Sequence, residues 1–191
     1  MAKVVVKAKV KKIKRKFPVQ LVAPEFLNSV SLGHTSVSDL NLMVGKTSKM
    51  NMMYITKNIK NQNVRLVFKV VEVSSGLAKT VVSSYMQIPY YLGRFVKVGS
   101  DLIEDSFVVK SKDGVLVRIK PFIVTKANAS EMVLSSLRAE SRKLLEKELT
   151  SIKAEEFMAS VINGKVQGVF RNELKKIFPL KAFEFRRVDL E

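Results

Sequence analysis

The sequence predicts an α+β fold, mainly because the hydrophobic period changes along its 191 residues. Up to about residue 125, apolar residues alternate with polar ones in several segments, which is typical of half-buried strands. From residue 128 they recur at helical spacing instead, and a last alternating segment closes the chain. Strands first, helices later and one returning strand indicate an α+β protein.

Two hairpins form the best-defined part of the predicted sheet. In the first, a strand at 63–73 turns at a Ser-Ser-Gly sequence and returns at 79–85. In the second, β-branched runs at 107–110 and 115–119 flank Asp113-Gly114. Glycine supplies the positive φ that a tight hairpin turn needs, so we expect the second hairpin to be short. Ahead of both, residues 17–26 are expected to form a short strand that a proline ends.

The remaining elements follow from turn and cap signals. Residues 28–42 are rich in Ser and Asn, so we expect a loop there. Asn128 with Glu131 resembles a capping box at the start of a leucine-striped helix. Two further helices fit 153–162 and 166–178, the second ended by a proline. From Phe183 to Arg187 apolar and polar residues alternate again, so we expect this segment to return to the sheet as a strand.

No internal repeat and no Gly/Ser linker divides the sequence, so we expect one domain with three regions. These regions are a basic N-terminal arm at 1–16, a β-rich core at 17–127, and a helical region with the terminal strand at 128–191. A hydrophobic fraction of 47% is enough for a packed core and excludes general disorder.

Charge is the second strong feature of the sequence. Thirty-four Lys and Arg against 17 Asp and Glu give a net charge of +17, which repels itself unless a polyanion neutralises it. Residues 1–100 carry 17 basic and 3 acidic side chains, whereas residues 101–191 carry 17 and 14. We therefore expect a polyanion on the N-terminal half, and protein neighbours or solvent on the nearly balanced C-terminal half.

The first 16 residues hold eight cations and no carboxylate. Three interpretations of this arm are open: a solvated tail, an amphipathic helix on a membrane surface, or an extended segment along nucleic-acid phosphates. Its β-branched valines favour extended structure over a helix. We favour the phosphate contacts, for which the candidates are Lys3, Lys7, Lys9, Lys11, Lys12, Lys14, Arg15 and Lys16.

Several classes of function lack the residues that they need. Without cysteine there is no thiolate zinc site or cysteine nucleophile, and His34 is the only histidine. Gly45-Lys46-Thr47 lacks the earlier glycine of a P-loop. The pairs Glu104-Asp105 and Glu155-Glu156 are expected to be solvated or to complement a helix dipole. Lysines interrupt the apolar runs near the N-terminus, so neither a signal peptide nor a membrane span is predicted. We expect a cytoplasmic protein that is no enzyme, with no catalytic residue, no cofactor and no metal.

Basic residues with apolar or aromatic neighbours also recur outside the arm, which favours a nucleic-acid partner. No RNP aromatic pair, KH-type loop or zinc finger is present, so recognition of RNA backbone and shape is favoured over base readout. These candidates are Lys57, Lys60, Arg65, Arg94, Lys97, Lys110, Lys112, Lys175, Lys176, Lys181, Arg186 and Arg187.

Six segments in register carry a resemblance over about residues 15–189. They are LVAPEF (21–26), KNQNVRLVFKV (60–70), Tyr91-Leu92, KSKDGVLVRI (110–119), VINGKV (161–166) and KKIFPLKAFEFRR (175–187). In this order they resemble the archaeal and eukaryotic small-subunit ribosomal protein family called S-three-Ae, also named e-S-one. The short chain, without long terminal extensions, is more similar to archaeal members.

The resemblance implies a β-barrel-like antiparallel core with packed C-terminal helices, on the platform of the small subunit near the messenger-RNA exit. It implies contacts with ribosomal RNA and neighbouring ribosomal proteins, messenger RNA as a further candidate partner, and no catalysis. This chain has Lys97-Val98-Gly99 where the family carries an arginine cluster, so only Arg94 and Lys97 are retained there. Besides the arm, RNA contacts are expected by position at Lys60, Arg65, Lys110, Lys112, Arg118, Lys181, Arg186 and Arg187.

The leading hypothesis is a structural component of the small ribosomal subunit that binds ribosomal RNA mainly through its phosphate backbone. The alternative is a free-standing RNA-binding or RNA-chaperone protein that acts off the ribosome. A third class, an enzyme acting on an acidic or nucleic-acid substrate, would depend on His34 or Glu104.

Overall fold

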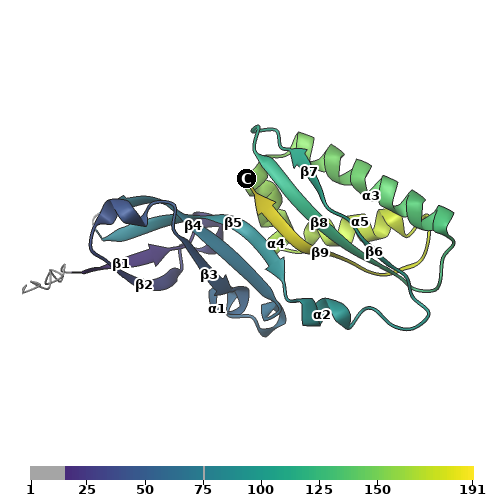
Figure 1. The fold of residues 1–191 in the computed structure, drawn as a ribbon, viewed down its shortest axis with the longest axis horizontal. Helices are drawn as coiled ribbons and strands as arrows, with labels where there is room; N and C mark the ends of the chain where they lie inside the picture. Colours follow the sequence, from purple (N-terminus) through teal and green to yellow (C-terminus); the bar gives the residue numbers. More distant parts are fainter. Residues whose placement is uncertain (1–15, 75) are drawn as a thin grey trace, which may run out of the picture.

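The structure is a computed structural model that describes residues 16–74 and 76–191, and within these residues nine strands form one sheet (Figure 1). The strands are β1 (Phe17–Val22), β2 (Ser31–Val37), β3 (Thr47–Asn51), β4 (Val64–Ser74), β5 (Leu77–Gln87), β6 (Leu102–Glu104), β7 (Phe107–Lys110), β8 (Leu116–Thr125) and β9 (Leu180–Leu190). The α-helices are α1 (Met52–Thr56), α2 (Pro89–Gly93), α3 (Glu131–Ser151), α4 (Ala154–Ile162) and α5 (Lys165–Leu174). Short 3-10 helices are η1 (Glu25–Leu27), η2 (Leu40–Met43) and η3 (Ile59–Asn61).

The strand order is β2-β1-β5-β9-β8-β6, with β3 attached through β4 and β7 attached through β8. Every pair is antiparallel except β1 with β5. Among the described strands, β2, β3, β6 and β7 each have one partner and form edges, so the sheet is open and not a closed barrel. The predicted α+β class, with an antiparallel sheet, C-terminal helices and a returning C-terminal strand, is confirmed.

Strand β5 connects the two ends of the elongated molecule (Figure 1). Its first residues, 77–79, pair with β1, and its last ones, 84–86, pair with β9 on the same edge. Strand β9 then pairs along most of its length with β8. The C-terminal strand therefore carries the sheet from the β1–β5 end to the end that holds the helices.

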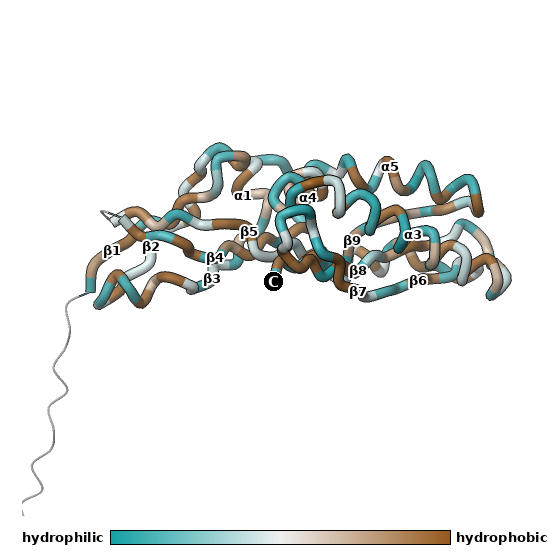
Figure 2. The backbone as a smooth tube through the Cα atoms, turned by 90° about the horizontal axis from the view of Figure 1, so that it is seen from above, coloured by the Kyte–Doolittle hydropathy of each residue, from teal (hydrophilic) through white to brown (hydrophobic). Residues whose placement is uncertain are grey.

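The helices α3, α4 and α5 pack against one face of the β7–β8–β9 part of the sheet. Figure 2 shows apolar stretches of β8 and β9 in the region of α4. At the centre of this core Phe185 is fully buried, with edge-to-face contacts to Phe157 of α4 and to Phe183. A second, smaller cluster of Leu92, Phe122 and Val124 lies beside α2.

Both predicted hairpins are confirmed, but three local expectations are wrong. The expected loop at 28–42 contains strand β2, because its backbone pairs with β1 over Phe17–Val22 despite polar side chains. The long helix begins at Glu131 with Ser130 at its N-cap and no side-chain cap bond, so there is no capping box at Asn128. The third helix ends at Leu174 and continues as turns. Within the described residues, no helix combines the length and apolar character of a membrane span.

Candidate nucleic-acid interface

One row of side chains crosses four neighbouring strands. Arg65 of β4 is opposite Met86 of β5, Met86 is opposite Arg187 of β9, and Arg187 is opposite Lys120 of β8. Because adjacent strands are about 4.8 Å apart, the row extends for roughly 14 Å across the sheet. Ile119 and Val188, next to the row in sequence, are fully buried in the core. Side chains alternate along a strand, so the row points to the face away from the helices.

The row lines a groove with a volume of about 370 Å³, which we call the basic groove. Its lining residues are Arg65, Met86, Gln87, Ile88, Pro89, Lys120, Arg186 and Arg187. Arg186 enters it from an irregular position, because the register of β9 with β8 passes from Phe185 to Arg187 and leaves Arg186 without an opposite residue. Two consecutive arginines of β9 therefore reach the same groove, which simple strand alternation would not allow.

Two of the four cations in the basic groove have carboxylate partners. Arg186 donates from Nη1 to both oxygens of Glu104, at 2.9 and 3.0 Å, and Arg187 Nε lies 2.7 Å from Asp189. Both arginine side chains are about half exposed, at 48%. Exposed ion pairs of this kind contribute only about 0–1 kcal/mol to the free energy of folding, so a phosphate can replace the carboxylate at little cost.

The other two cations of the basic groove are Arg65 and Lys120. Within the described residues, neither takes part in an ion pair. Their charges are therefore available to an anionic ligand without breaking an existing contact. Lys120 was not predicted, although Arg118 and Lys120 are two residues apart on a strand and so share a face.

Three further predicted residues belong to the β7–β8 hairpin and lie outside the basic groove. Lys110 and Lys112 are exposed, and Lys112 lies in the turn. Arg118 is paired with the carboxylate of Glu191 at 2.9 Å. The hairpin therefore presents two lysines to solvent, apart from the row.

The remaining predicted residues on the N-terminal side are separate from one another. Lys16 is exposed directly before β1, and Lys60 is exposed in η3. The guanidinium of Arg94 lies 5.3 Å from the ring centroid of Tyr90 on α2, a cation–π contact on an exposed aromatic ring. The other predicted arm residues lie outside the described residues; these are Lys3, Lys7, Lys9, Lys11, Lys12, Lys14 and Arg15.

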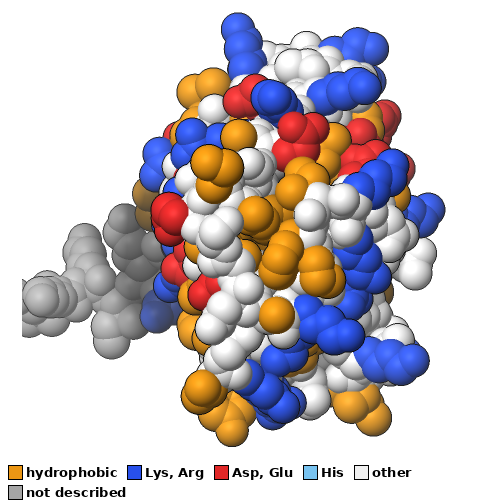
Figure 3. Space-filling view, turned by 90° about the vertical axis from the view of Figure 1, so that its right-hand side faces the viewer, with side chains coloured by type: hydrophobic (Ala, Val, Ile, Leu, Met, Phe, Trp, Pro, Cys, Tyr) orange, Lys and Arg blue, Asp and Glu red, His pale blue; other side chains and the backbone are white. Residues whose placement is uncertain are grey.

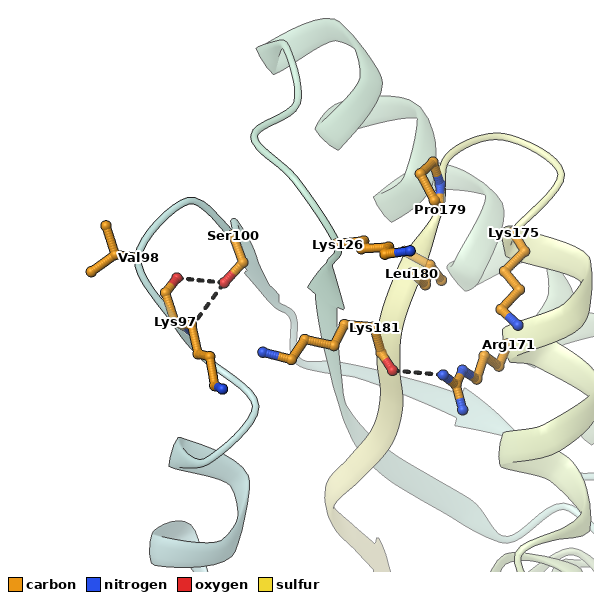
Figure 4. Close-up of a pocket in the computed structure, with 9 residues that line it drawn as sticks. All are labelled: Lys97, Val98, Ser100, Lys126, Arg171, Lys175, Pro179, Leu180 and Lys181. Atoms are coloured by element: carbon orange, nitrogen blue, oxygen red, sulfur yellow. Dashed lines mark hydrogen bonds between the residues drawn. The ribbon is translucent and has the colours of Figure 1, made fainter.

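Lys97 and Lys181 come together at a second hollow, of about 640 Å³, which we call the basic pocket (Figure 4). Its lining residues are Lys97, Val98, Ser100, Lys126, Arg171, Lys175, Pro179, Leu180 and Lys181. Lys126 and Arg171 were not predicted. A signal for Arg171 existed, because Arg171 and Lys175 are four residues apart on a helix and share one face. Lys126 follows directly after β8 and carries no such pattern.

Basic side chains are also grouped at the level of the whole surface. Figure 3 views the end of the molecule that lies to the right in Figure 1. Lys and Arg side chains (blue) follow one another through the lower right part of this view, with no Asp or Glu (red) between them. Further Lys and Arg side chains lie in the upper part of the same view, where Asp and Glu are found among them, so the lower right part is the one without nearby carboxylates.

The residues on which an enzyme would depend are engaged elsewhere or exposed. His34 is exposed on β2, opposite Gln20. Glu104 pairs with Arg186, while Asp105 accepts two hydrogen bonds from Arg142, whose guanidinium holds the pKa of Asp105 below its usual value. Across residues 16–74 and 76–191, no group of three His, Cys, Asp or Glu side chains is arranged to hold a metal ion.

Comparison with known proteins gives a consistent result. The family model described as "Ribosomal S3Ae family" matches residues 5–191 of the chain. A "Small ribosomal subunit protein eS1" from Nanoarchaeum equitans is 29% identical over 178 residues, covering 93% of this chain and 90% of the relative. Proteins of the same name are 28% identical in Archaeoglobus fulgidus, covering 89% of this chain and 82% of the relative, and 28% identical in Haloarcula marismortui, covering 93% and 83%.

Proposed function

The chain belongs to the Ribosomal S3Ae family, and from this membership we propose that it is a structural protein of the small ribosomal subunit that binds ribosomal RNA through phosphates. The observation that carries the proposal is the row Arg65–Met86–Arg187–Lys120 on the face of the sheet away from the helices. Three cations fixed on hydrogen-bonded strands form a positive surface that costs little to order when an RNA backbone binds.

The chemistry of the basic groove fits phosphates better than bases. Its polar side chains are mainly donors: the guanidinium groups of Arg65, Arg186 and Arg187 and the ammonium group of Lys120. Guanidinium groups match phosphate oxygens with two parallel hydrogen bonds. Contacts of this kind set the position of a protein on RNA without reading sequence. The N-terminal arm would add further phosphate contacts in the same way.

We further propose that the protein lies on the platform of the small subunit near the messenger-RNA exit, in cytoplasmic ribosomes. Neighbouring ribosomal proteins are the expected protein partners, with messenger RNA as a further candidate. The relatives, which are named as small ribosomal subunit proteins, support the place in the small subunit, whereas the platform position follows from the family resemblance alone. This role is structural and requires no catalytic group.

The proposal is tested first by co-sedimentation of the full chain with purified small subunits at increasing salt. We expect stoichiometric retention through high salt, because many phosphate contacts act together. Release as a free monomer at moderate salt would contradict a structural role. Binding to RNA without stoichiometric presence in purified small subunits would favour the free-standing RNA-binding alternative.

The double variant Arg65→Gln/Lys120→Gln tests the basic groove. Neither residue is paired with a carboxylate in the described part of the chain, so the substitutions break no ion pair there. Each phosphate contact contributes about 0.7–0.9 to the slope of log affinity against log salt, so we expect binding to small-subunit ribosomal RNA to lose roughly 1.4–1.8 from this slope. Lys147→Gln/Lys165→Gln is the matched control, because both lysines are exposed, line neither hollow and, within the described residues, have no carboxylate partner. Equal slopes for the two double variants would exclude the basic groove as an RNA contact.

A further inference from the structure

The basic pocket holds five cationic side chains and no carboxylate among its nine lining residues. The cations are Lys97, Lys126, Arg171, Lys175 and Lys181. In the basic groove, by contrast, two carboxylates pair with the arginines. Like charges gathered around one hollow repel one another, and a bound anion removes this repulsion. The composition of the pocket therefore points to an anionic ligand.

The pocket is assembled from parts of the chain that hydrogen bonds hold together. The main-chain N–H of Lys97 donates to Ser100 Oγ at 3.0 Å, and Ser100 Oγ donates to the carbonyl oxygen of Lys97 at 2.6 Å. On the opposite wall, the N–H of Lys126 donates to the carbonyl oxygen of Pro179 at 2.9 Å. The loop after α2 is therefore closed by bonds within itself, and the segment before β9 is bonded to the residue that follows β8.

Two of the cations are positioned by their own side-chain contacts. Arg171 Nη2 donates to the carbonyl oxygen of Lys181 at 2.7 Å, as Figure 4 shows, and Lys181 Nζ donates to the carbonyl oxygen of Phe95 at 2.7 Å. A guanidinium has five N–H donors, so Arg171 retains donors for a ligand. In Figure 4, the side chain of Arg171 extends from α5 toward Lys181 of β9.

One carboxyl group interacts electrostatically with Arg171 from outside the pocket. This is Glu184 of β9, which accepts a hydrogen bond from Gln87 Nε2 at 2.8 Å. Burial raises the pKa of Glu184, and the charge of Arg171 opposes this shift. Glu184 is not among the residues that line the pocket, so its carboxyl group lies outside the space that a ligand would occupy.

The size and lining of the pocket narrow the class of anion. A volume of about 640 Å³ is in the range of small-ligand sites and exceeds what a single phosphate needs. No aromatic side chain lines it, so it offers no stacking partner to a base. Sugar–phosphate backbone, with its bases directed elsewhere, fits these features better than a free nucleotide.

The position of the pocket connects it to the basic groove. Ile88 and Pro89, at the start of α2, line the groove, and Lys97, shortly after α2, lines the pocket. Between them Tyr90 is 77% exposed, with the Arg94 guanidinium over its ring. Tyr90 thus lies between the two sets of lining residues in sequence, and exposed aromatic side chains near basic grooves can stack the bases of single-stranded RNA.

We propose that the basic pocket binds the phosphodiester backbone of an RNA strand that continues from the basic groove past α2. This inference rests on the proposed function and adds a second, separate contact site on the same RNA. Its arginine and lysines come mostly from the C-terminal half, where net charge alone indicates no polyanion.

The test uses the full-length double variant Lys126→Gln/Lys175→Gln, with Lys147→Gln/Lys165→Gln as the control of equal charge. All four lysines are exposed, so the variants should fold, and thermal unfolding verifies this. We expect the salt slope of binding to small-subunit ribosomal RNA to fall by roughly 1.4–1.8 for the pocket variant, and to stay near the wild-type value for the control. Ultraviolet crosslinking should place RNA on peptides that contain residues 97–100 and 171–181 of the wild type.

The outcomes separate this inference from the proposed function. If the salt slope of RNA binding falls in the groove variant but is the same in the pocket variant and the control, the pocket is no RNA site. The proposed function would still hold in that case. Absence of ribosomal RNA binding by the wild type would remove both. Titration with pyrophosphate, followed by NMR, identifies a small-anion site: pyrophosphate bound in the pocket with an unchanged RNA slope would also overturn the proposal.

Discussion

The N-terminal and C-terminal halves of the protein carry their charge in opposite ways. Residues 1–100 have only three carboxylates, yet their described cations are mostly separate from one another on β-strands and loops. Residues 101–191 are nearly balanced, but they supply three of the four groove cations and four of the five pocket cations. Net charge therefore identifies the class of partner, whereas the arrangement of opposite charges decides where that partner can bind.

The physical reason lies in the positions of the C-terminal carboxylates. Asp105 and Glu140 are paired with Arg142 and Lys143 on α3, away from both hollows. Glu191 is paired with Arg118, and Glu184 is largely buried. No carboxylate is therefore among the residues that line the basic pocket, and Glu184 interacts with Arg171 from outside it. The expectation that residues 101–191 face protein neighbours stays a prediction. The same half also supplies most of the cations of the basic groove and the basic pocket.

Among variants that compare the two halves, we expect removal of residues 1–16 to change RNA binding most. This deletion takes away eight cations and should flatten the salt slope of binding to small-subunit ribosomal RNA by roughly 5.6–7.2 if each cation contacts one phosphate. Filter binding at several salt concentrations measures it, with the groove variant as a smaller reference. An unchanged slope would show that the arm is a solvated tail and that the C-terminal hollows carry the binding.

The next largest effect concerns whether the two halves unfold together. Phe68 of β4 and Phe185 of β9 are both fully buried and belong to one continuous core cluster. Phe68→Ala and Phe185→Ala should each lower the free energy of unfolding by about 3–5 kcal/mol in urea denaturation, with one cooperative transition. Phe17→Ala, at a side chain that is 57% exposed, should cost much less. Two transitions, each shifted by only one of the core variants, would make the halves independent units.

The smallest effect is a pH dependence at Glu184. Burial raises the pKa of its carboxyl group, and the hydrogen bond from Gln87 only partly opposes this. The folded protein therefore binds the proton more tightly than the unfolded chain, so stability falls as pH rises from the usual carboxylate pKa through the raised one. Glu184→Gln removes this loss and should gain stability over the wild type toward neutral pH.

The measurement for Glu184 is urea denaturation of both proteins at about pH 4 and about pH 7, on either side of the titration. The free-energy difference between Glu184→Gln and the wild type should be larger at the higher pH. A free-energy difference that is the same at both pH values would show that burial does not raise the pKa of Glu184.

The regular parts of the fold follow from local sequence pattern. The hairpin of β4 and β5, the Asp113-Gly114 turn and the leucine stripe of α3 each have a period or a turn residue that predicts them. Strand β2 has no such pattern, because its polar side chains are stabilised by backbone pairing with β1 and not by burial of one face. Helices α1 and α2, with five residues each, are too short to give a period.

For the candidate interface, the sequence by itself determined the sign of the charge, its excess near the N-terminus and the family resemblance. Only the tertiary structure decided which cations lie next to one another. Lys120 and Arg187 are adjacent because β8 and β9 pair across more than sixty residues of chain, and Lys126 joins Arg171 because α5 packs on β9. Such neighbours result from long-range strand register and helix packing, which minimise exposed apolar surface and leave no local pattern in the sequence.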